Sequence, residues 1–421
     1  MSPIFTTWGA LLGLVVAVVL IMRRMVPAYA LLLGALVGGL VGGGGLIPTV
    51  NAMVDGTRGM MPSVLRILAS GVLAGALIKT GSAEKIADAI VKGLGARLAI
   101  PAVAVSTMLV CAVGVFIDVS VITVAPVALA VGQRAGVPVS ALLLAMIGGG
   151  KAGNVISPNP NTIAVADAFQ LDLTALMARN AVPALIALCI TIALAYLLAR
   201  RRKALSRAGQ SGCRGDERRA KVPSLWVALV GPLVVVVLLM LRPILGIAVD
   251  PLIALPAGGL ASIVLTRHTG ETKEIMEFGL SKVAGVVILL IATGTVAGIV
   301  KASSLNTDMI AVIQACHLPA FVLAPMSGIL MAGATASTTA GATIAAQTFN
   351  GALLEAEVPA VAAAAMVHAG ATVIDSLPHG SFFHATGGAV FMSFGERMKL
   401  VPYEALIGLS TTLVAVACYL V

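Results

Sequence analysis

The sequence carries little charge and few aromatic residues for its length. Charged residues make up 11% of the 421 positions and aromatic residues 4%, whereas hydrophobic residues make up 59%. A soluble domain usually carries about 25% charged residues, and the mean hydropathy here is +1.05. These proportions exclude an ordinary soluble domain and indicate an integral membrane protein.

Paired cysteines and a cleavable signal peptide are also missing. The first 22 residues have neither a basic start nor a small-residue cleavage site, so we expect residues 3–22 to be a retained helix. No cysteine belongs to a CxxC pair or shows a Cys/His ligand spacing, and we interpret the cysteines as small apolar fillers. They are Cys111, Cys189, Cys213, Cys316 and Cys418.

Long uncharged runs recur along the whole chain. A helix needs about 20 apolar residues to cross the hydrocarbon core of a bilayer, and the runs lack the apolar/polar alternation of outer-membrane barrel strands. We therefore predict an all-α polytopic membrane protein. The runs are 3–22, 25–54, 98–117, 180–199, 222–241, 283–300 and 405–421.

Basic residues concentrate in residues 200–221, which hold nine Lys or Arg against Asp216 and Glu217. Cytoplasmic loops of membrane proteins carry an excess of Lys and Arg. This segment is therefore expected to be a cytoplasmic linker between a first transmembrane repeat, residues 1–199, and a second, residues 222–421. The same bias explains the net charge of +9 without a nucleic-acid partner.

The two segments on either side of the linker resemble each other. Near-constant spacing favours duplication over chance matches in apolar sequence. Trp8, Gly13 and Met22 recur 218 positions later as Trp226, Gly231 and Met240, and Ala145, Gly150 and Pro158 recur 220 positions later as Ala365, Gly370 and Pro378.

The placement of positive charge predicts that the two repeats cross the membrane in opposite directions. Arg23 follows the first run, and Lys79 and Lys85 follow the third, which puts the amino terminus outside. Residues 222–241 then leave the cytoplasm, opposite to residues 3–22. Inverted repeats are a signature of secondary transporters, whose sites lie where the repeats meet.

Glycine, proline and asparagine interrupt the apolar sequence at residues 148–169, and the corresponding stretch of the second repeat is residues 369–389. Proline removes an amide donor and clashes with the preceding turn, so a continuous helix is not expected there. Backbone groups freed at membrane depth must line protein or a watery cavity. The candidate substrate ligands in the first stretch are Asn154, Ser157, Asn159 and Asn161.

A second pair of interruptions is expected at residues 113–126 and 332–347. Amino termini of half-helices present a positive dipole end suited to a carboxylate. Ser337, Thr338 and Thr339 are therefore candidate substrate ligands. The alternative for each is interhelical packing, since small polar residues are common at membrane helix contacts.

Asp118, Lys151 and Asp375 each lie within a neutral run, although an Asp at the centre of a membrane helix costs about 2.5–3.5 kcal/mol. Lys151 either neutralises a substrate carboxylate or extends to the interface from a hairpin tip. Asp375 either carries a proton or is a structural partner for Lys151 or a histidine. Asp118 is expected at a water-lined position with a role in proton coupling.

Histidines titrate near neutral pH and add proton chemistry to the second interrupted stretch. His384 is a candidate for proton coupling, and His379 and Ser376 are candidate substrate ligands. A lone histidine is more commonly a hydrogen-bonded packing residue, so we expect a proton role for at most one or two of His368, His379 and His384.

These interrupted stretches resemble the gluconate permease (GntP) family of bacterial proton symporters, within the ion transporter superfamily. The segment NVISPNPNTIAVA, residues 154–166, is similar to a GFLPPHPGP loop of that family. ATVIDSLPHGSF, residues 371–382, resembles its HVNDSGFW-like segment, and AGATASTTAGATIAA, residues 332–346, its GSATVAM-like segment. The chain differs in having Asn159 where the family has His, and in extra residues between Ser376 and Gly380.

The resemblance implies import of a small organic acid anion with protons by alternating access, through paired re-entrant hairpins and in a homodimer in the bacterial inner membrane. It matches Asp375 to the acidic position of the second motif, and Ser337, Thr338 and Thr339 to its hydroxyl cluster. No cofactor, metal or enzymatic activity is expected.

Two other functions remain open from the sequence. Asp118 and Asp375 with neighbouring hydroxyls are suited to a hard cation, as in a sodium/proton antiporter. An intramembrane metalloenzyme would use His368, Asp375, His379 and His384 as ligands, but the sequence lacks an HExxH-type motif.

Overall fold

The structure is a computed structural model that describes residues 4–23, 25–95, 98–203, 223–247, 249–305, 307–308, 319–378 and 380–421, without the side chains of 201–203 and 242–243. The regular structure of these residues is helical, apart from one isolated bridge between Phe5 and Ser303. The predicted all-α class is confirmed. Among the described residues, five helices are long and apolar enough to cross a membrane, and several shorter apolar helices accompany them.

The first half of the chain forms eleven described helices. The predicted run 25–54 is divided by Gly42 to Gly45 into two helices, because four consecutive glycines favour a turn over a helix. In chain order they are α1 (Thr7–Met22), α2 (Pro27–Val41), α3 (Leu46–Arg58), α4 (Met61–Lys79), α5 (Ser82–Leu94), α6 (Ala99–Ala112), α7 (Ile117–Ala135), α8 (Val139–Asn154), α9 (Pro160–Ala168), α10 (Leu173–Arg179) and α11 (Ala181–Lys203).

The described helices of the second half follow a similar order. They are α12 (Leu225–Leu245), α13 (Pro251–Leu265), η2 (Thr269–Glu271), α14 (Thr272–Lys301), η3 (Ala320–Val322), α16 (Leu323–Thr335), α17 (Thr338–Glu355), α18 (Ala360–Gly370), α19 (Ser381–Ala389), α20 (Phe394–Met398) and α21 (Val401–Leu420). Helices α7, α8 and α9 begin 221 positions before α17, α18 and α19, so the spacing found in the sequence recurs in the helix boundaries.

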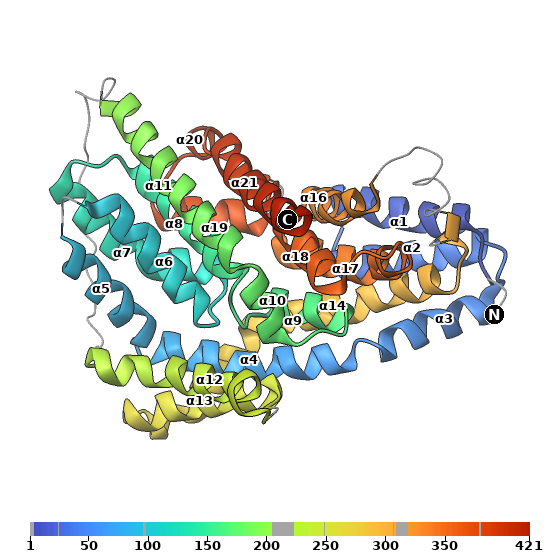
Figure 1. The fold of residues 1–421 in the computed structure, drawn as a ribbon, viewed down its shortest axis with the longest axis horizontal. Coiled ribbons are helices and arrows are strands. Elements are labelled where there is room, and N and C mark those ends of the chain that lie inside the picture. Colours follow the sequence, from blue (N-terminus) through green and yellow to red (C-terminus); the bar gives the residue numbers. More distant parts are fainter. Residues whose placement is uncertain are drawn as a thin grey trace.

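The two halves exchange contacts at the centre of the molecule. Helix α9 of the first half packs against α17 of the second, and α19 of the second half packs against α7 of the first. Figure 1 shows α9 and α10 reaching the α17 and α18 region, with α3 and α4 in line below and α14 beside them. The corresponding helices of the two halves therefore form reciprocal pairs.

Both predicted helix interruptions of the first half are present. Helix α8 ends at Asn154 and α9 begins at Pro160, where proline suits the first helical position because its missing N–H needs no partner there. The other interruption, residues 113–116, is shorter than predicted, because Pro126 lies inside α7 rather than at a break. Gly114 turns the chain there with a φ of +105°.

The second half repeats these interruptions. Helix α16 ends at Thr335 and α17 begins at Thr338, and Ala336 between them has a φ of +46°. Residues 371–378 and Gly380 separate α18 from α19 without regular helix. The prediction of broken helices in both halves is confirmed.

Glycine allows the interrupted helices to pack with their backbones close together. A Cβ added to Gly149 of α8 would lie 2.1 Å from the carbonyl oxygen of Ala104 in α6. A Cβ added to Gly370 of α18 would lie 2.4 Å from the carbonyl oxygen of Pro325 in α16. Small residues at membrane helix contacts permit such close approach, and both contacts recur 221 positions apart.

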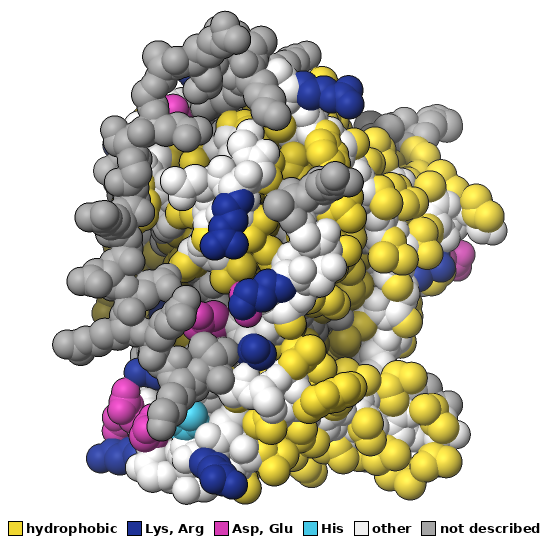
Figure 2. Space-filling model, turned by 90° about the vertical axis from the view of Figure 1, so that its left-hand side faces the viewer, with side chains coloured by type: hydrophobic (Ala, Val, Ile, Leu, Met, Phe, Trp, Pro, Cys, Tyr) yellow, Lys and Arg dark blue, Asp and Glu magenta, His cyan; other side chains and the backbone are white. Residues whose placement is uncertain are grey.

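Much of the described surface is hydrophobic. Figure 2 shows hydrophobic side chains covering one half of the face in view, with charged side chains gathered on the other half. Trp8 and Trp226, which correspond in the two halves, are both 80% exposed. Broad exposed apolar surface and exposed tryptophans are expected of a protein surrounded by lipid.

Candidate functional site

The centre of the candidate site is a buried ion pair between the two halves. The Nζ atom of Lys151, in the last turn of α8, lies 2.7 Å from Oδ1 of Asp375, in the interruption after α18. The side chains are only 1% and 2% exposed. The interruption leaves Asp375 outside any helix, so its carboxylate faces the end of a helix from the other half.

All three donors of the Lys151 ammonium have acceptors. Besides Asp375, they are donated to the backbone carbonyl oxygens of Thr372 at 2.5 Å and Glu404 at 3.3 Å. Lys151 therefore connects α8 with the second interruption and with α21. The predicted extension of Lys151 to the interface is wrong, because its charge is satisfied deep inside the protein.

Both oxygens of the Asp375 carboxylate also accept hydrogen bonds. Thr338, at the start of α17, donates to Oδ2 at 2.6 Å, and Ser376 donates to Oδ1 at 2.9 Å. The structure thus brings four predicted site residues together from both halves. The structure shows the ion pair expected from the alternative in which Asp375 is a partner of Lys151.

A second cluster lies where α8 ends and α9 begins. We call it the amide cluster, and it consists of Asn154, Asn159, Asn161 and Thr162. Asn159 caps α9 by accepting from the backbone N–H groups of Asn161 and Thr162 at 2.9 and 3.1 Å. The side-chain oxygen of Asn154 accepts two hydrogen bonds, from Nδ2 of Asn159 at 2.6 Å and from Nδ2 of Asn161 at 2.9 Å. Nδ2 of Asn154 and Oδ1 of Asn161 are buried without a partner among the described residues.

Each half brings its own two interruptions into contact. In the first half, Ser157 donates to the carbonyl oxygen of Cys111, at the end of α6, at 2.7 Å. In the second half, a Cβ added to Gly380 would lie 2.3 Å from the carbonyl oxygen of Ala336. Non-helical backbone from four segments therefore converges around Lys151 and the amide cluster, as buried non-helical backbone in a membrane must.

The predicted site residues Ser337, Thr339 and Asp118 lie outside these two clusters. Ser337 is the N-cap of α17 and accepts from the N–H of Ala340 at 3.2 Å, while the Thr339 side chain is partly exposed. Asp118 is partly exposed in the first turn of α7, where the charge of Lys282 attracts it. None of the three contacts Lys151 or Asp375 in the described hydrogen bonds and ion pairs.

Neither His368 nor His384, the described histidines of this region, contacts Asp375 in the described hydrogen bonds and ion pairs. His384 is exposed, and its Nε2 lies 2.9 Å from the carbonyl oxygen of Pro378. His368 is completely buried in α18, with no hydrogen-bond partner for either ring nitrogen within the described part of the chain. His379 lies outside the described residues.

Comparisons with known proteins identify the family. The sequence model of the GntP family permeases matches residues 5–256. A Haemophilus influenzae protein described as an uncharacterized transporter is 49% identical over 413 residues, which cover 97% of this chain and 96% of that protein. The chain belongs to the GntP permease family.

More distant relatives are also permeases. An uncharacterized permease of Haemophilus influenzae is 31% identical over 172 residues, 40% of this chain and 35% of that protein. The inner membrane permease YgbN of Escherichia coli is 28% identical over 182 residues, 41% of this chain and 38% of that protein.

The fold of this GntP permease resembles a solved transporter structure. The crystal structure of the Alcanivorax borkumensis YdaH transporter, described as having an unusual topology, aligns with a TM-score of 0.64 at 16% identity over 87% of each chain. At this identity the likeness concerns the fold alone. The family identifies the protein as a membrane transporter rather than an enzyme.

The sequence analysis missed a second buried ion pair of this GntP permease. Arg397 in α20 binds the carboxylate of Glu404 in α21 through both terminal nitrogens, with Nη2 at 3.1 Å from Oε2. Its guanidinium lies 4.8 Å from the centre of the Phe383 ring. Because the carbonyl of Glu404 accepts from Lys151, this pair fixes one wall of the site. The sequence did offer one signal for this pair, since Arg397 and Glu404 lie just before the apolar run 405–421.

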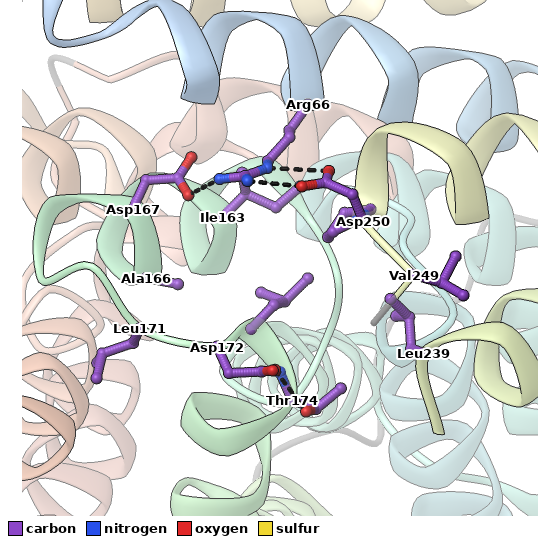
Figure 3. Close-up of a pocket in the computed structure, with 12 residues that line it drawn as sticks. Arg66, Ile163, Ala166, Asp167, Leu171, Asp172, Thr174, Leu239, Val249 and Asp250 are labelled. Atoms are coloured by element: carbon purple, nitrogen blue, oxygen red, sulfur yellow. Dashed lines mark hydrogen bonds and ion pairs between the residues drawn. The ribbon is translucent and has the colours of Figure 1, made fainter. Parts of the chain in front are cut away.

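A third charged group lies at the far end of α9. Arg66 in α4 contacts Asp167 of α9 and Asp250, the N-cap of α13, and Ser63 donates to Asp167 at 2.6 Å. Figure 3 shows Arg66 between the two carboxylates, above a cavity of about 160 Å³ that Asp172 also lines. Three carboxylates against one guanidinium make this cavity a poor fit for an anion, and α9 separates it from Asn159 by about 12 Å.

The metalloenzyme alternative has no support in the described part of the GntP permease. Among those residues, no three His, Cys, Asp or Glu side chains form a group able to hold a metal ion. Asp375 faces Lys151, and His384 points to the carbonyl of Pro378 instead.

Proposed function

We propose that this GntP permease is a proton-coupled symporter that imports a small organic acid anion across the bacterial inner membrane. The observation that carries the proposal is the buried pair of Lys151 and Asp375 where interrupted helices of both halves meet. Lys151 supplies one cation for a carboxylate, and Asp375 supplies one carboxylate able to bind a proton. Intramembrane ionisable residues commonly mark ion or proton paths.

Alternating access between two inverted repeats accounts for the arrangement of the helices. The recurrence of helix boundaries at 221 positions and the reciprocal pairs α9–α17 and α19–α7 support duplication of residues 1–199 in residues 222–421. The opposite orientation rests on the distribution of Lys and Arg. Helices α16 and α18, with 13 and 11 residues, are too short to cross the hydrocarbon core and suit re-entrant hairpins.

The site residues divide by role in this proposal. Lys151 binds the substrate carboxylate, and Asp375 carries the proton. The amide cluster offers two free polar atoms to substrate hydroxyls, one a donor and one an acceptor. Ser157, Ser337, Thr338, Thr339, Ser376 and His379 stay proposed as further substrate contacts, and Asp118 and His384 as accessory proton groups.

The test is uptake into proteoliposomes that contain the purified protein. The probes are radiolabelled gluconate, glycerate, pyruvate and succinate, with an inward proton gradient imposed at constant membrane potential. We expect at least one probe to accumulate above its external concentration, and a protonophore to abolish that accumulation.

Other outcomes would contradict the proposal. Accumulation that survives collapse of the proton gradient, or that requires a sodium gradient instead, would exclude proton coupling. Sodium-dependent proton efflux without any organic acid would favour the antiporter alternative, in which Asp118 and Asp375 bind a hard cation.

The assembly is proposed to be a homodimer, which rests on the family resemblance. The mass of the protein in detergent, measured by light scattering with the detergent contribution subtracted, tests it. A single-chain mass of 42.4 kDa would exclude the dimer under those conditions.

A further inference from the structure

We propose that transport by this protein is electroneutral for a monocarboxylate, with one proton per anion, because the substrate carboxylate takes the place of Asp375 on Lys151. The inference rests on the proposed function and specifies its charge balance. Its basis is that all three donors of Lys151 and both carboxylate oxygens of Asp375 are engaged by each other and by neighbouring groups.

Lys151 has no charge to offer while Asp375 is ionised. Its three donors all have acceptors, one of which is the only carboxylate that it contacts among the described residues. A second anion beside the intact pair would leave one negative charge uncompensated in a buried place, which is costly. A substrate carboxylate can therefore replace Asp375 only after that side chain is neutralised.

A proton neutralises Asp375 without leaving a charge behind. When the proton binds one oxygen of the carboxylate, the Nζ–H donor of Lys151 transfers from that carboxylate to the substrate carboxylate. The protonated Asp375 keeps Thr338 and Ser376 as hydrogen-bond neighbours. The empty site holds Lys151 and an ionised Asp375, and the loaded site holds Lys151, a neutral Asp375 and one anion. Both states sum to zero charge.

The charged groups of the surrounding elements do not alter this balance. In α21, Glu404 is compensated by Arg397 of α20, and both side chains are fully buried. At the start of α7, Asp118 is partly exposed and contacts neither Lys151 nor Asp375 in the described hydrogen bonds and ion pairs. Helices α6 and α16 contain no Lys, Arg, Asp or Glu. The backbone carbonyl of Cys111 in α6 accepts a hydrogen bond from Ser157.

The remaining charges lie at distant helix ends or on exposed residues. Arg134, Arg200 and Glu355 occupy the carboxyl-terminal ends of α7, α11 and α17, and His384 of α19 is exposed. His368 of α18 is completely buried without a hydrogen-bond partner in the described part of the chain, so a charged imidazole there would be costly. Lys151 and Asp375 are thus the two groups whose pairing changes, and Asp118 and His384, as accessory groups, would relay the same proton rather than carry another.

The experiment separates the two driving forces in proteoliposomes. Radiolabelled gluconate and glycerate are the probes, at a fixed inward proton gradient, and valinomycin with potassium sets the membrane potential at zero or at about 100 mV of either sign. One net charge moved across about 100 mV changes the accumulation ratio about 50-fold. We expect the accumulation ratio of the monocarboxylates to be the same at all three potentials.

The outcomes distinguish this inference from the proposed function. Proton-driven accumulation that rises with an inside-negative potential means more than one proton per anion and overturns the inference alone. Accumulation that rises with an inside-positive potential means fewer than one proton per anion and also overturns it. Uptake of none of gluconate, glycerate, pyruvate and succinate under any gradient contradicts both, because the proposed function then lacks its substrate class.

Asp375→Asn provides a second test, in which net uptake should depend on the membrane potential. The variant keeps the Lys151 charge but cannot release a proton, so we expect pH-independent exchange of the anion and net uptake that increases with an inside-positive potential. Asp55→Asn is the matched control, because it makes the same change in an exposed pair with Arg58 and should remain electroneutral. If Asp375→Asn does not fold, the wild-type measurement still decides.

Discussion

Lys151 lies at the end of α8, just before the first-half interruption, and Asp375 lies in the corresponding interruption of the second half, yet the two halves place different chemistry there. The counterpart of Asp375, 221 positions earlier, is Asn154, and the counterpart of Lys151 is Thr372, whose carbonyl accepts from it. The first half therefore contributes amides to its interruption, whereas the second contributes an ion pair with the first. We propose that duplication supplied the backbone and that substitutions at single positions made the site charged and asymmetric.

Removing one member of this pair should destabilise the fold more than removing both. Lys151→Met leaves the Asp375 carboxylate buried without its cation, so we expect a loss of about 3–5 kcal/mol. Lys151→Met combined with Asp375→Leu should recover most of that loss, because similar apolar side chains need no compensation. Thermal unfolding in detergent measures both, and a double variant no more stable than Lys151→Met would contradict this compensation.

The interrupted helices depend on glycine at their contacts. In α8, Gly149 lies against the backbone of α6, and in α18, Gly370 lies against the backbone of α16. Each pair holds a helix end at the depth where its interruption begins. The positions of Asn154 and Asp375 thus depend on how closely these backbones approach.

Gly149→Ala and Gly370→Ala should each separate a helix pair. The added Cβ would lie 2.1 or 2.4 Å from a carbonyl oxygen, so the backbone must shift, at a cost of about 1–3 kcal/mol. Gly93→Ala in α5 is the control, because nothing lies within 4 Å of its added Cβ. Unfolding temperatures should fall for the first two variants only, and an unchanged temperature for Gly149→Ala would contradict this close packing.

The orientation of the whole chain follows from the charge of its loops. Ile47 follows the α2–α3 loop, and Lys273 follows the corresponding loop of the second half between α13 and α14; both are well exposed. If the halves are inverted, these two positions lie on opposite sides of the membrane. Helix α14, about 45 Å long, extends beyond the hydrocarbon core and carries Lys273 outside it.

Cysteine labelling tests this inversion directly. In a cysteine-free background, Ile47→Cys should react with an impermeant maleimide added to right-side-out vesicles, and Lys273→Cys should react only in inside-out vesicles. Lys92→Cys in α5 is the reference for the predicted inside face, since its side chain is 74% exposed. Labelling of Ile47→Cys and Lys273→Cys from the same side would rule out inverted repeats.

The sequence by itself determined the membrane class, the helical fold, the interruptions and the family. These features follow from local properties: apolar length, proline and glycine content, and motifs of a dozen residues. It also identified Lys151, Thr338, Asp375 and Ser376, because a charge in an apolar run needs compensation and hydroxyls at a break need partners.

Only the tertiary structure decided which of these groups compensate one another. The pairing of Lys151 with Asp375 joins residues 224 positions apart and excludes an interfacial lysine. Arg66 was missed because its partners, Asp167 and Asp250, lie on distant helices, and no local pattern specifies such pairs. The sequence specifies which side chains are charged, but the neutralisation of each charge depends on distances between side chains that only the packing of the helices sets.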